Sequence, residues 1–287
     1  MPIDDFIIHI YVLVDDFLKA DSSSLRKSGP KPHLTDAEVM TMEVVGEHLG
    51  LGSDKRIFDY FSHHWAEWFP ALKCRTTFVR QCANLWKVKE HLQQSLIKTL
   101  ASNCDLFLFD GFPIPTCHKK RVHQRNPFKG IGAFGYCAAK DEKYFGFKGH
   151  LLTDQYGTIM HFSLTPANVD ERDVLPEVTE KSQGMVIADK GLIRPELSEL
   201  LLQRGLNLQT PLRENMKDKR PPHFVTHIIS LRRTIETVIA QLVDRFHIQS
   251  IRAKDLWHLA SKIGRKILAH TIGCFMAKSL KFDQILS

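Results

Sequence analysis

The sequence lacks any apolar run long enough to cross a bilayer. A membrane-spanning helix needs about 18–20 consecutive apolar residues, and no stretch of the 287 residues approaches that length. The segment from Met1 to Ala20 has no basic leader and carries acids at both ends of its apolar run, so it does not resemble a secretory signal peptide. These absences exclude an integral membrane protein and favour a cytoplasmic one.

Cysteine is scarce and shows no metal-binding pattern. There are six cysteines and no CxxC pair, so neither a zinc site nor a disulfide framework is expected. No internal repeat or low-complexity tract is present, and 43% hydrophobic with 25% charged residues is ordinary for a folded protein. We therefore expect a reduced, globular protein whose free cysteines are Cys74, Cys82, Cys104, Cys117, Cys137 and Cys274.

Positive charge is present in excess and is unevenly distributed. The net charge is +7, with a pI of about 9.1. Lys119 to His150 holds eight Lys and Arg against two acids, and Pro211 to Lys266 holds twelve against five. Nucleic acid bound along these segments would explain the excess. The alternative is ordinary solvated surface, which accounts for many charge clusters.

The first hundred residues show helical periodicity throughout. Apolar residues recur at steps of three and four, and Thr35 to Glu38 forms a capping-box pattern. We expect a helical N-terminal domain over residues 1–100. Such a bundle could bind DNA, although no recognition helix is evident. Its expected helices span Ile3–Leu18, Thr35–Leu49, Lys55–Trp68 and Thr76–Leu100.

The pattern changes to short β-type runs at Asp105. Asp154 to Gly157 reads as the turn of a hairpin, and long helical patterns cover Val225–Ile248 and Leu256–Leu280. Hairpin strands followed by a strand of parallel type predict a mixed α/β domain, with helices packed on a five-stranded sheet, over residues 101–287. The strands are expected at Leu106–Asp110, Ala133–Ala139, Tyr144–Thr153, Thr158–Leu164 and Met185–Ala188, with Leu206–Thr210 as a possible further strand.

Two aspartates stand where buried strands end. Asp110 follows the run LFLF and precedes Gly111, and Asp189 follows the run MVIA and precedes Lys190. An unbroken apolar run is typical of a strand buried on both faces. Two carboxylates leaving the core side by side would suit a metal that prefers hard oxygen ligands.

A third acid, Glu236, lies on the long helix predicted from Val225. The buried stripe of that helix includes Ile235, so Glu236 falls at its edge. Arg232 lies one turn earlier, and Arg233 is adjacent to it. The alternative is an exposed Arg–Glu pair, which contributes only a few tenths of a kcal/mol to helix stability.

Together these features resemble the catalytic domain of DDE transposases of bacterial insertion sequences. The resemblance rests on Asp110 after its strand, the ADKG around Asp189 and the Arg-x-x-x-Glu of Arg232 and Glu236. It is extended by the segment LTPANVDERDVLPEV before the second acid. It covers about Asp105 to Lys278 and implies a ribonuclease H-like core. It also implies a catalytic and metal-binding triad of Asp110, Asp189 and Glu236.

The resemblance further implies a chemistry and its partners. The protein would cut DNA at the ends of its insertion sequence and transfer the 3′ hydroxyl to target DNA. Two Mg²⁺ ions, for which Mn²⁺ could substitute, would stabilise the attacking and leaving oxygens. A homodimer on double-stranded DNA in the bacterial cytoplasm, at the nucleoid, is expected. The alternatives are a nuclease of the same fold without strand transfer, and a non-catalytic DNA-binding protein.

Basic residues near the acids are the candidate DNA contacts. Phosphate groups are usually bound by Lys and Arg side chains. Four of the candidates follow the first catalytic strand, and the others adjoin Asp189 and Glu236. The set is Lys119, Lys120, Arg121, Arg125, Lys190, Arg232 and Arg233.

Overall fold

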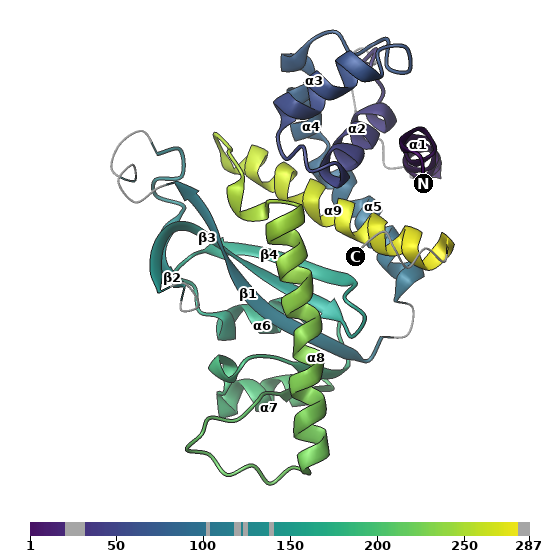
Figure 1. Ribbon diagram of the computed structural model, residues 1–287. Helices are drawn as coiled ribbons and strands as arrows, with labels where there is room; N and C mark the ends of the chain where they lie inside the picture. The colour runs from purple at the N-terminus through teal and green to yellow at the C-terminus, as the bar shows by residue number, and fades with distance from the viewer. Residues whose placement is uncertain (21–31, 102–103, 118–121, 123–125, 138–140, 281–287) are drawn as a thin grey trace. The chain divides into compact units, whose positions relative to one another are not determined.

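The computed structural model describes residues 1–20, 32–101, 104–117, 122, 126–137 and 141–280 (Figure 1). The chain divides into two compact units, which are described separately below. One unit combines Met1–Leu96 with the chain from Asp244 onward, and the other is Ile97–Val243. Within the described residues, no helix is both long and apolar enough to span a membrane.

The first unit is helical. The helix expected over Thr76–Leu100 is in fact two helices, because the chain leaves the α-helical conformation at Leu85. The second of them begins at Trp86, whose ring packs edge-on against that of Trp257 with centroids 5.6 Å apart. The helices are α1 (Ile3–Ala20), α2 (Asp36–His48), α3 (Asp54–His64), α4 (Arg75–Asn84), α5 (Trp86–Leu100) and α9 (Leu256–Leu280).

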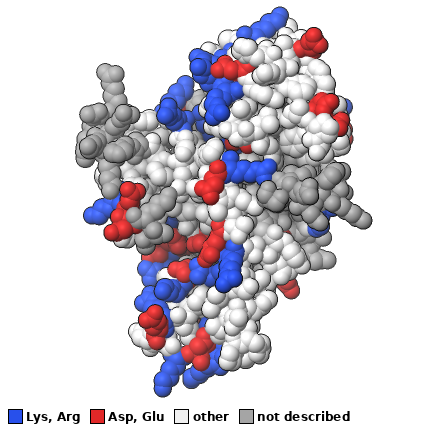
Figure 2. Space-filling view, in the orientation of Figure 1, with Lys and Arg blue, Asp and Glu red and all other residues white. Residues whose placement is uncertain are grey.

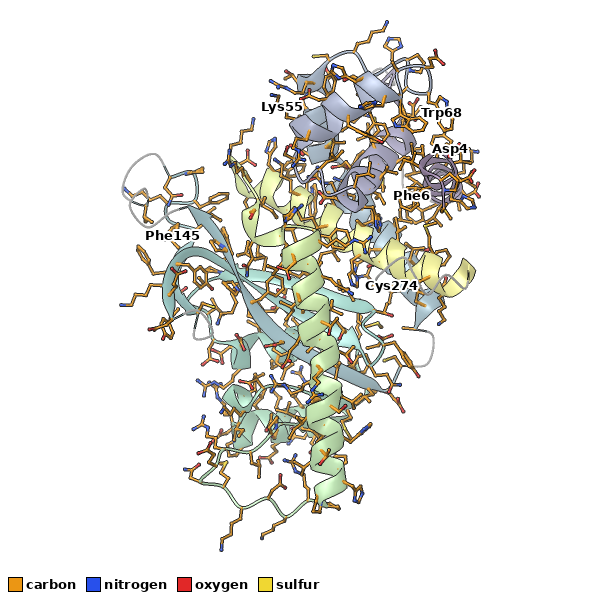
Figure 3. The ribbon with its side chains drawn as sticks, in the orientation of Figure 1. Asp4, Phe6, Lys55, Trp68, Phe145 and Cys274 are labelled. Atoms are coloured by element: carbon orange, nitrogen blue, oxygen red, sulfur yellow. The ribbon has the colours of Figure 1, made fainter. Side chains whose placement is uncertain are left out.

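The start of α2 confirms the predicted capping box. The Thr35 hydroxyl accepts a hydrogen bond from the Glu38 N–H at 3.1 Å, and the Glu38 carboxylate accepts one from the Thr35 N–H at 2.6 Å. Two N–H groups that the helix leaves unpaired are thereby satisfied. The other end of α2 packs on α1, where the Phe6 ring (labelled in Figure 3) lies edge-on to His48, with centroids 5.2 Å apart.

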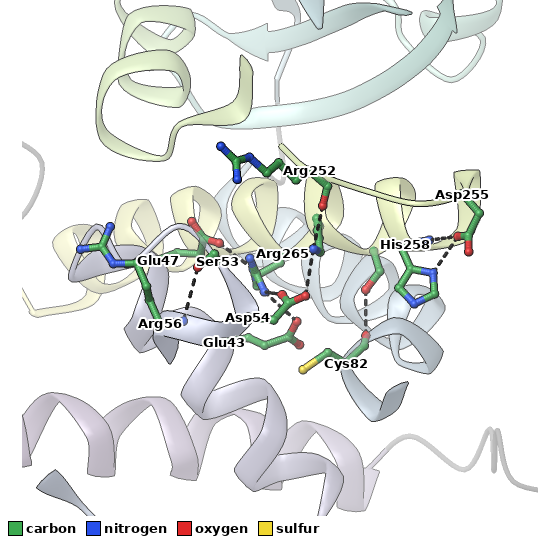
Figure 4. A network of polar contacts seen from close by, with 12 residues as sticks. Glu43, Glu47, Ser53, Asp54, Arg56, Cys82, Arg252, Asp255, His258 and Arg265 are labelled. Atoms are coloured by element: carbon green, nitrogen blue, oxygen red, sulfur yellow. Dashed lines mark hydrogen bonds and ion pairs between the residues drawn. The ribbon is translucent and has the colours of Figure 1, made fainter. Parts of the chain in front are cut away.

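A buried ionic network lies inside the helical unit (Figure 4). Arg265 of α9 donates to Glu47 of α2 at 2.6 Å and to Asp54 of α3 at 2.7 Å. Lys266 donates to the other Glu47 oxygen at 2.8 Å. Lys89 of α5 donates to Glu43 at 2.7 Å. Burial alone would raise the pKa of Asp54, but Arg265 and Lys262 outweigh burial and bring it down to about 2.

This network explains why the domain boundary differs from the one expected. Residues 101–287 were predicted to form one catalytic domain, but the chain from Asp244 onward clusters with the N-terminal helices. Arg265 and Lys266 are each 1% exposed. Such buried cations need acidic partners, and α2 and α3 supply those acids. Helical periodicity locates α9 but does not reveal which unit it joins.

The second unit is a mixed sheet with helices packed on it. Its strand order is β2-β3-β1-β5-β6, with β4 also paired to β3, so there are six described strands rather than five. β1 is antiparallel to β3 and parallel to β5. The strands are β1 (Leu106–Cys117), β2 (Ala133–Cys137), β3 (Glu142–Asp154), β4 (Ile159–Pro166), β5 (Gly184–Ile187) and β6 (Leu206–Gln209).

Strand β3 is long enough to pair with two strands along one edge. β4 pairs with it from Phe147 onward, and β2 pairs with it before that point. Gly146 marks the change of partner with φ +151°, and a Cβ there would lie 2.5 Å from the Ile114 carbonyl oxygen. Beside it, Phe145 (labelled in Figure 3) packs edge-on against Phe134 of β2, with ring centroids 5.2 Å apart.

The β3–β4 connection confirms the predicted hairpin turn. The Asp154 carboxylate accepts hydrogen bonds from the Tyr156 N–H at 2.9 Å and the Thr158 N–H at 2.7 Å. Asp154 therefore holds the turn, and Gly157 in the same turn has φ +88°. Both features match the sequence interpretation that Asp154 is a turn residue rather than a catalytic acid.

Helices cover both faces of the sheet. Helices α6 (Glu171–Val178) and α7 (Pro195–Gln203) share a buried core with Phe107, Phe109 and Val186. The long helix α8 (Pro222–Ala240) packs on β1 and passes in front of the sheet in Figure 1. Because strand side chains alternate between faces, each strand residue can be assigned to the α6–α7 face or the α8 face.

Candidate active site

Asp110 and Asp189 lie at the same level of two neighbouring strands. The parallel β1–β5 pair ends with Leu108 opposite Ile187. Asp110 lies two residues further along β1, which continues to Cys117 rather than ending at Asp110 as expected, because β3 pairs along its whole length. Asp189 lies two residues beyond the end of β5, where the backbone is still extended (φ −72°, ψ 156°). The carboxyl ends of parallel strands meet at one edge of a sheet, where ligand sites commonly form. The structure thus brings both predicted strand acids to one edge.

Alternation also assigns the two aspartates to one face. Phe107, Phe109, Val186 and Ala188 belong to the core shared with α6 and α7. Residues at intervening positions, including Asp110 and its counterpart Asp189, therefore face α8. This is the helix on which the sequence places the third acid.

The Asp110 carboxyl group is held in a low-polarity environment. Burial raises its pKa to about 7, and the Gly111 N–H, which donates to the carboxylate at 2.8 Å, only partly opposes the shift. The negative charges of Glu171 and Asp189 raise the pKa further, while Arg232 lowers it. A perturbed carboxyl group beside other acids is typical of sites that bind a cation.

Arg232 connects the other two acids. Its Nη1 lies 3.2 Å from Asp189 Oδ1, and its Nη2 lies 3.8 Å from Glu236 Oε1. The predicted i, i+4 pair on α8 is therefore present, but the shorter contact of the arginine is with Asp189. Of the three side chains in these contacts, Arg232 is 20% exposed, Asp189 is 39% exposed and Glu236 is 56% exposed. The helix register thus directs Glu236 toward the edge where Asp189 lies.

The three acids do not form a tight ligand cluster in the described part of the chain, which contains no group of three or more His, Cys, Asp or Glu that could hold a metal ion. What lies between Asp189 and Glu236 is the Arg232 guanidinium. The donor atoms are nevertheless carboxylate oxygens, which suit Mg²⁺ or Mn²⁺. Asp189 and Glu236 each contact a different nitrogen of that guanidinium.

Only some of the candidate DNA contacts can be located. Lys190 follows Asp189 and is exposed, and Arg233 is exposed on α8. Acidic and basic side chains are interspersed on the face drawn in Figure 2, rather than gathered into one basic surface. The candidates Lys119, Lys120, Arg121 and Arg125 lie outside the described residues.

Glu171 is a fourth acid near Asp110, and it is the first residue of α6. The cap itself is Asp170, whose carboxylate accepts the Arg172 N–H at 2.9 Å. The Glu171 carboxylate instead lies over the backbone of Gly111, where a Cβ would be only 2.5 Å from its Oε1. The same oxygen lies 3.3 Å from Lys148 Nζ. The feature of the sequence that could have indicated a group packed beside Asp110 is Gly111, because a glycine in a strand often marks a place where another part of the chain approaches closely.

Comparison with protein families matches this part of the chain to a known one. The model of the transposase DDE domain family matches residues 100–256, which include both strand acids and the whole of α8. The chain belongs to this family. The matched segment also contains Glu236.

A solved structure similar to this transposase is the cryo-EM structure of the piggyBac transposase synaptic complex with hairpin DNA. The identity is 11% and the TM-score 0.42, over 98% of this chain and 80% of that one. No curated protein matches the sequence significantly. The family assignment therefore rests on the match over residues 100–256.

Proposed function

We propose that this transposase cuts DNA at the ends of its own bacterial insertion sequence and joins the freed 3′ hydroxyl to target DNA. The observation that carries the proposal is the common level and common face of Asp110 and Asp189, with Glu236 connected to Asp189 through Arg232. Both steps exchange one phosphodiester oxygen for another, so one site can perform both.

The sheet supports a ribonuclease H-like core for this unit. Three antiparallel strands, β4, β3 and β1, are followed across the sheet by the parallel strands β5 and β6. The first acid lies on the central strand β1, the second after the neighbouring strand β5, and the third on a helix covering one face. This arrangement supports the catalytic roles proposed for Asp110, Asp189 and Glu236.

Asp110, Asp189 and Glu236 are proposed to hold two Mg²⁺ ions, with Mn²⁺ as a substitute. Bound metals of this kind stabilise charge on the attacking and leaving oxygens of a phosphodiester. The chain's own contribution is to hold Asp110 against the strand through the Gly111 N–H and to exclude water around it. Lys190, Arg232 and Arg233 are the proposed contacts to DNA phosphates, because Lys and Arg side chains bind phosphate through charge-assisted hydrogen bonds.

DNA at the element ends and at the target is the proposed partner, and a homodimer holding two ends is the proposed assembly. A nuclease of the same fold would cut but not join. Supplying pre-cut ends with a free 3′ hydroxyl separates the two functions, because only a transposase yields joined product.

Replacing Asp189 tests the proposal directly. We expect Asp189→Asn to lower the rate of Mg²⁺-dependent cleavage of element-end DNA by at least about 10³-fold, since a metal-binding carboxylate is lost. Salt-sensitive DNA binding, measured by fluorescence anisotropy, should persist. The matched control is Asp105→Asn, because Asp105 is exposed just before β1 and its replacement should leave cleavage unchanged.

Cleavage by Asp189→Asn at the wild-type rate would contradict the proposal. So would the absence of cleavage by the wild-type protein in Mg²⁺ or Mn²⁺ while DNA is bound. That second outcome would support the alternative of a DNA-binding protein whose acids are structural.

A further inference from the structure

The inference concerns Arg232 and rests on the function proposed above. Asp110 and Asp189 share one edge of the sheet, and Glu236 lies on the helix that packs on the same face. Like charges brought near one another oppose each other's ionisation. Among the described residues, the cation in ion-pair contact with any of the three is Arg232, which contacts Asp189 and Glu236. The structure thus already contains a cation at this site.

The position of Arg232 makes this contact more than a surface ion pair. Its side chain is only 20% exposed and comes from the helix that covers the acidic face. Its two terminal nitrogens point to two different acids, one on α8 and one at the end of β5. A planar guanidinium with several donors in a fixed geometry is suited to joining two carboxylates in this way.

Arg233 provides a comparison, because it is an arginine on the same helix that does not contact the acids. It is the next residue along α8, yet it is exposed and turns about 100° away around the helix. No ion pair of Arg233 with a described acid of the site is recorded in the structure, whereas Arg232 has two. The two side chains have the same charge and differ in what they contact.

We infer that Arg232 is the resident counter-ion of the acidic site and competes with divalent metal for Asp189 and Glu236. A metal ion that takes these two carboxylates must displace the guanidinium from them. In the absence of metal, Arg232 is therefore the positive charge that neutralises these two carboxylates. It also lowers the affinity of the site for metal, because its charge has to be displaced or repelled.

The test is metal binding in the absence of DNA and of any reaction. Mn²⁺ binding to the full-length protein can be measured by electron paramagnetic resonance, with wild type, Arg232→Gln, Arg233→Gln and Asp189→Asn compared. We expect Arg232→Gln to bind Mn²⁺ about five- to tenfold more tightly than wild type, since one partly buried positive charge beside the ligands is removed. Arg233→Gln removes the same charge from the exposed face and should change affinity by less than about twofold.

Arg232→Lys provides a second variant that keeps the charge. It should bind Mn²⁺ within about twofold of wild type, because a lysine at this position still repels the metal. A purely structural role for Arg232 predicts the opposite, namely weaker binding in Arg232→Gln because the acids lose their organisation. Equal or weaker Mn²⁺ binding by Arg232→Gln would therefore overturn the inference.

The outcomes also separate this inference from the proposed function. If wild type binds Mn²⁺ and Asp189→Asn does not, the metal site stands, and the Arg232 variants alone decide the inference. If wild type, Arg232→Gln and Asp189→Asn all fail to bind Mn²⁺, both the proposed metal site and the inference are overturned. Binding that appears only in Arg232→Gln would be the strongest support for competition.

Discussion

At the scale of single residues, the space above Gly111 is used by another part of the chain. The Glu171 carboxylate occupies the place where a side chain at position 111 would begin, and it pairs there with Lys148. An acid beside the strand that carries Asp110 raises the pKa of the Asp110 carboxyl group further, in addition to the effect of burial. The backbone of Gly111 does not adopt a positive φ, so the effect of a side chain at this position is to displace the Glu171 carboxylate.

Replacing Gly111 by alanine tests this packing. A Cβ would lie 2.5 Å from Glu171 Oε1, so the carboxylate must move and lose its contact with Lys148. Because Glu171 is a flexible, partly exposed side chain, we expect Gly111→Ala to lower the free energy of unfolding by no more than about 1 kcal/mol, measured by urea denaturation. In the Glu171→Ala background the same change should have little effect, because the clash is absent.

The control for this experiment is Gly264→Ala. Gly264 lies in α9, and nothing is within 4 Å of a Cβ placed there. Alanine should raise the free energy of unfolding by up to about 1 kcal/mol, since it is the better helix former. Equal losses from Gly111→Ala in both backgrounds would show that Glu171 is not the cause.

At the scale of elements, α9 is fixed to α2 and α3 by charges rather than by apolar packing alone. Arg265 satisfies Glu47 and Asp54 at the same time. A buried ion pair is expensive to break from one side, because the remaining charge stays buried without a partner. This dependence makes the helical unit sensitive to single substitutions in α9.

Arg265→Met should reveal that sensitivity. The methionine has similar length, but Glu47 and Asp54 lose their main cation, so we expect the free energy of unfolding to fall by about 3–5 kcal/mol. Thermal unfolding followed by circular dichroism would measure the loss. Arg252→Met is the matched control, because Arg252 is exposed near the start of α9 and should change stability by less than about 0.5 kcal/mol. A loss in Arg265→Met no larger than in the control would refute the role of the network.

Local patterns in the sequence predicted most of the elements but not their partners. The capping box, the β3–β4 turn and the start of α9, where the Asp255 carboxylate accepts the His258 N–H, follow from side-chain chemistry within a few residues, and they were predicted correctly. The break at Leu85, the sharing of β3 by two strands and the burial of Arg265 depend on contacts distant in sequence. At the site, the end of a buried strand predicted the position of Asp189, but Asp110 lies within β1, whose continuation to Cys117 depends on its pairing with β3. The position of Glu171 depends on how α6 packs on the sheet.

At the scale of the whole molecule, three buried histidines make stability depend on pH. Burial lowers the pKa of His48, His150 and His270 to about 4. An unfolded histidine has a pKa near 6.5, so as pH falls the unfolded chain takes up these protons first. The stabilising contribution is therefore complete above about pH 6.5 and is lost between pH 6.5 and 4.

Acid titration of stability tests this effect in both units, since His150 lies in the sheet unit and the other two in the helical unit. We expect the free energy of unfolding to fall by up to about 3 kcal/mol for each histidine across this range. Urea denaturation at a series of pH values would measure it. His270→Leu should make the pH dependence shallower, by one proton fewer taken up on unfolding. An unchanged slope would mean that His270 is protonated in the folded protein.

The discontinuous helical unit has a consequence for protein synthesis. Glu47 and Asp54 leave the ribosome long before Arg265 and Lys266, which neutralise them. Domains generally fold as units during translation. The helical unit cannot be completed until the ribosome has synthesised α9. The sheet unit, whose residues all lie between the two halves of the helical unit, has its full sequence available first. We therefore expect the sheet to fold on the ribosome while the N-terminal helices remain without their completing partner.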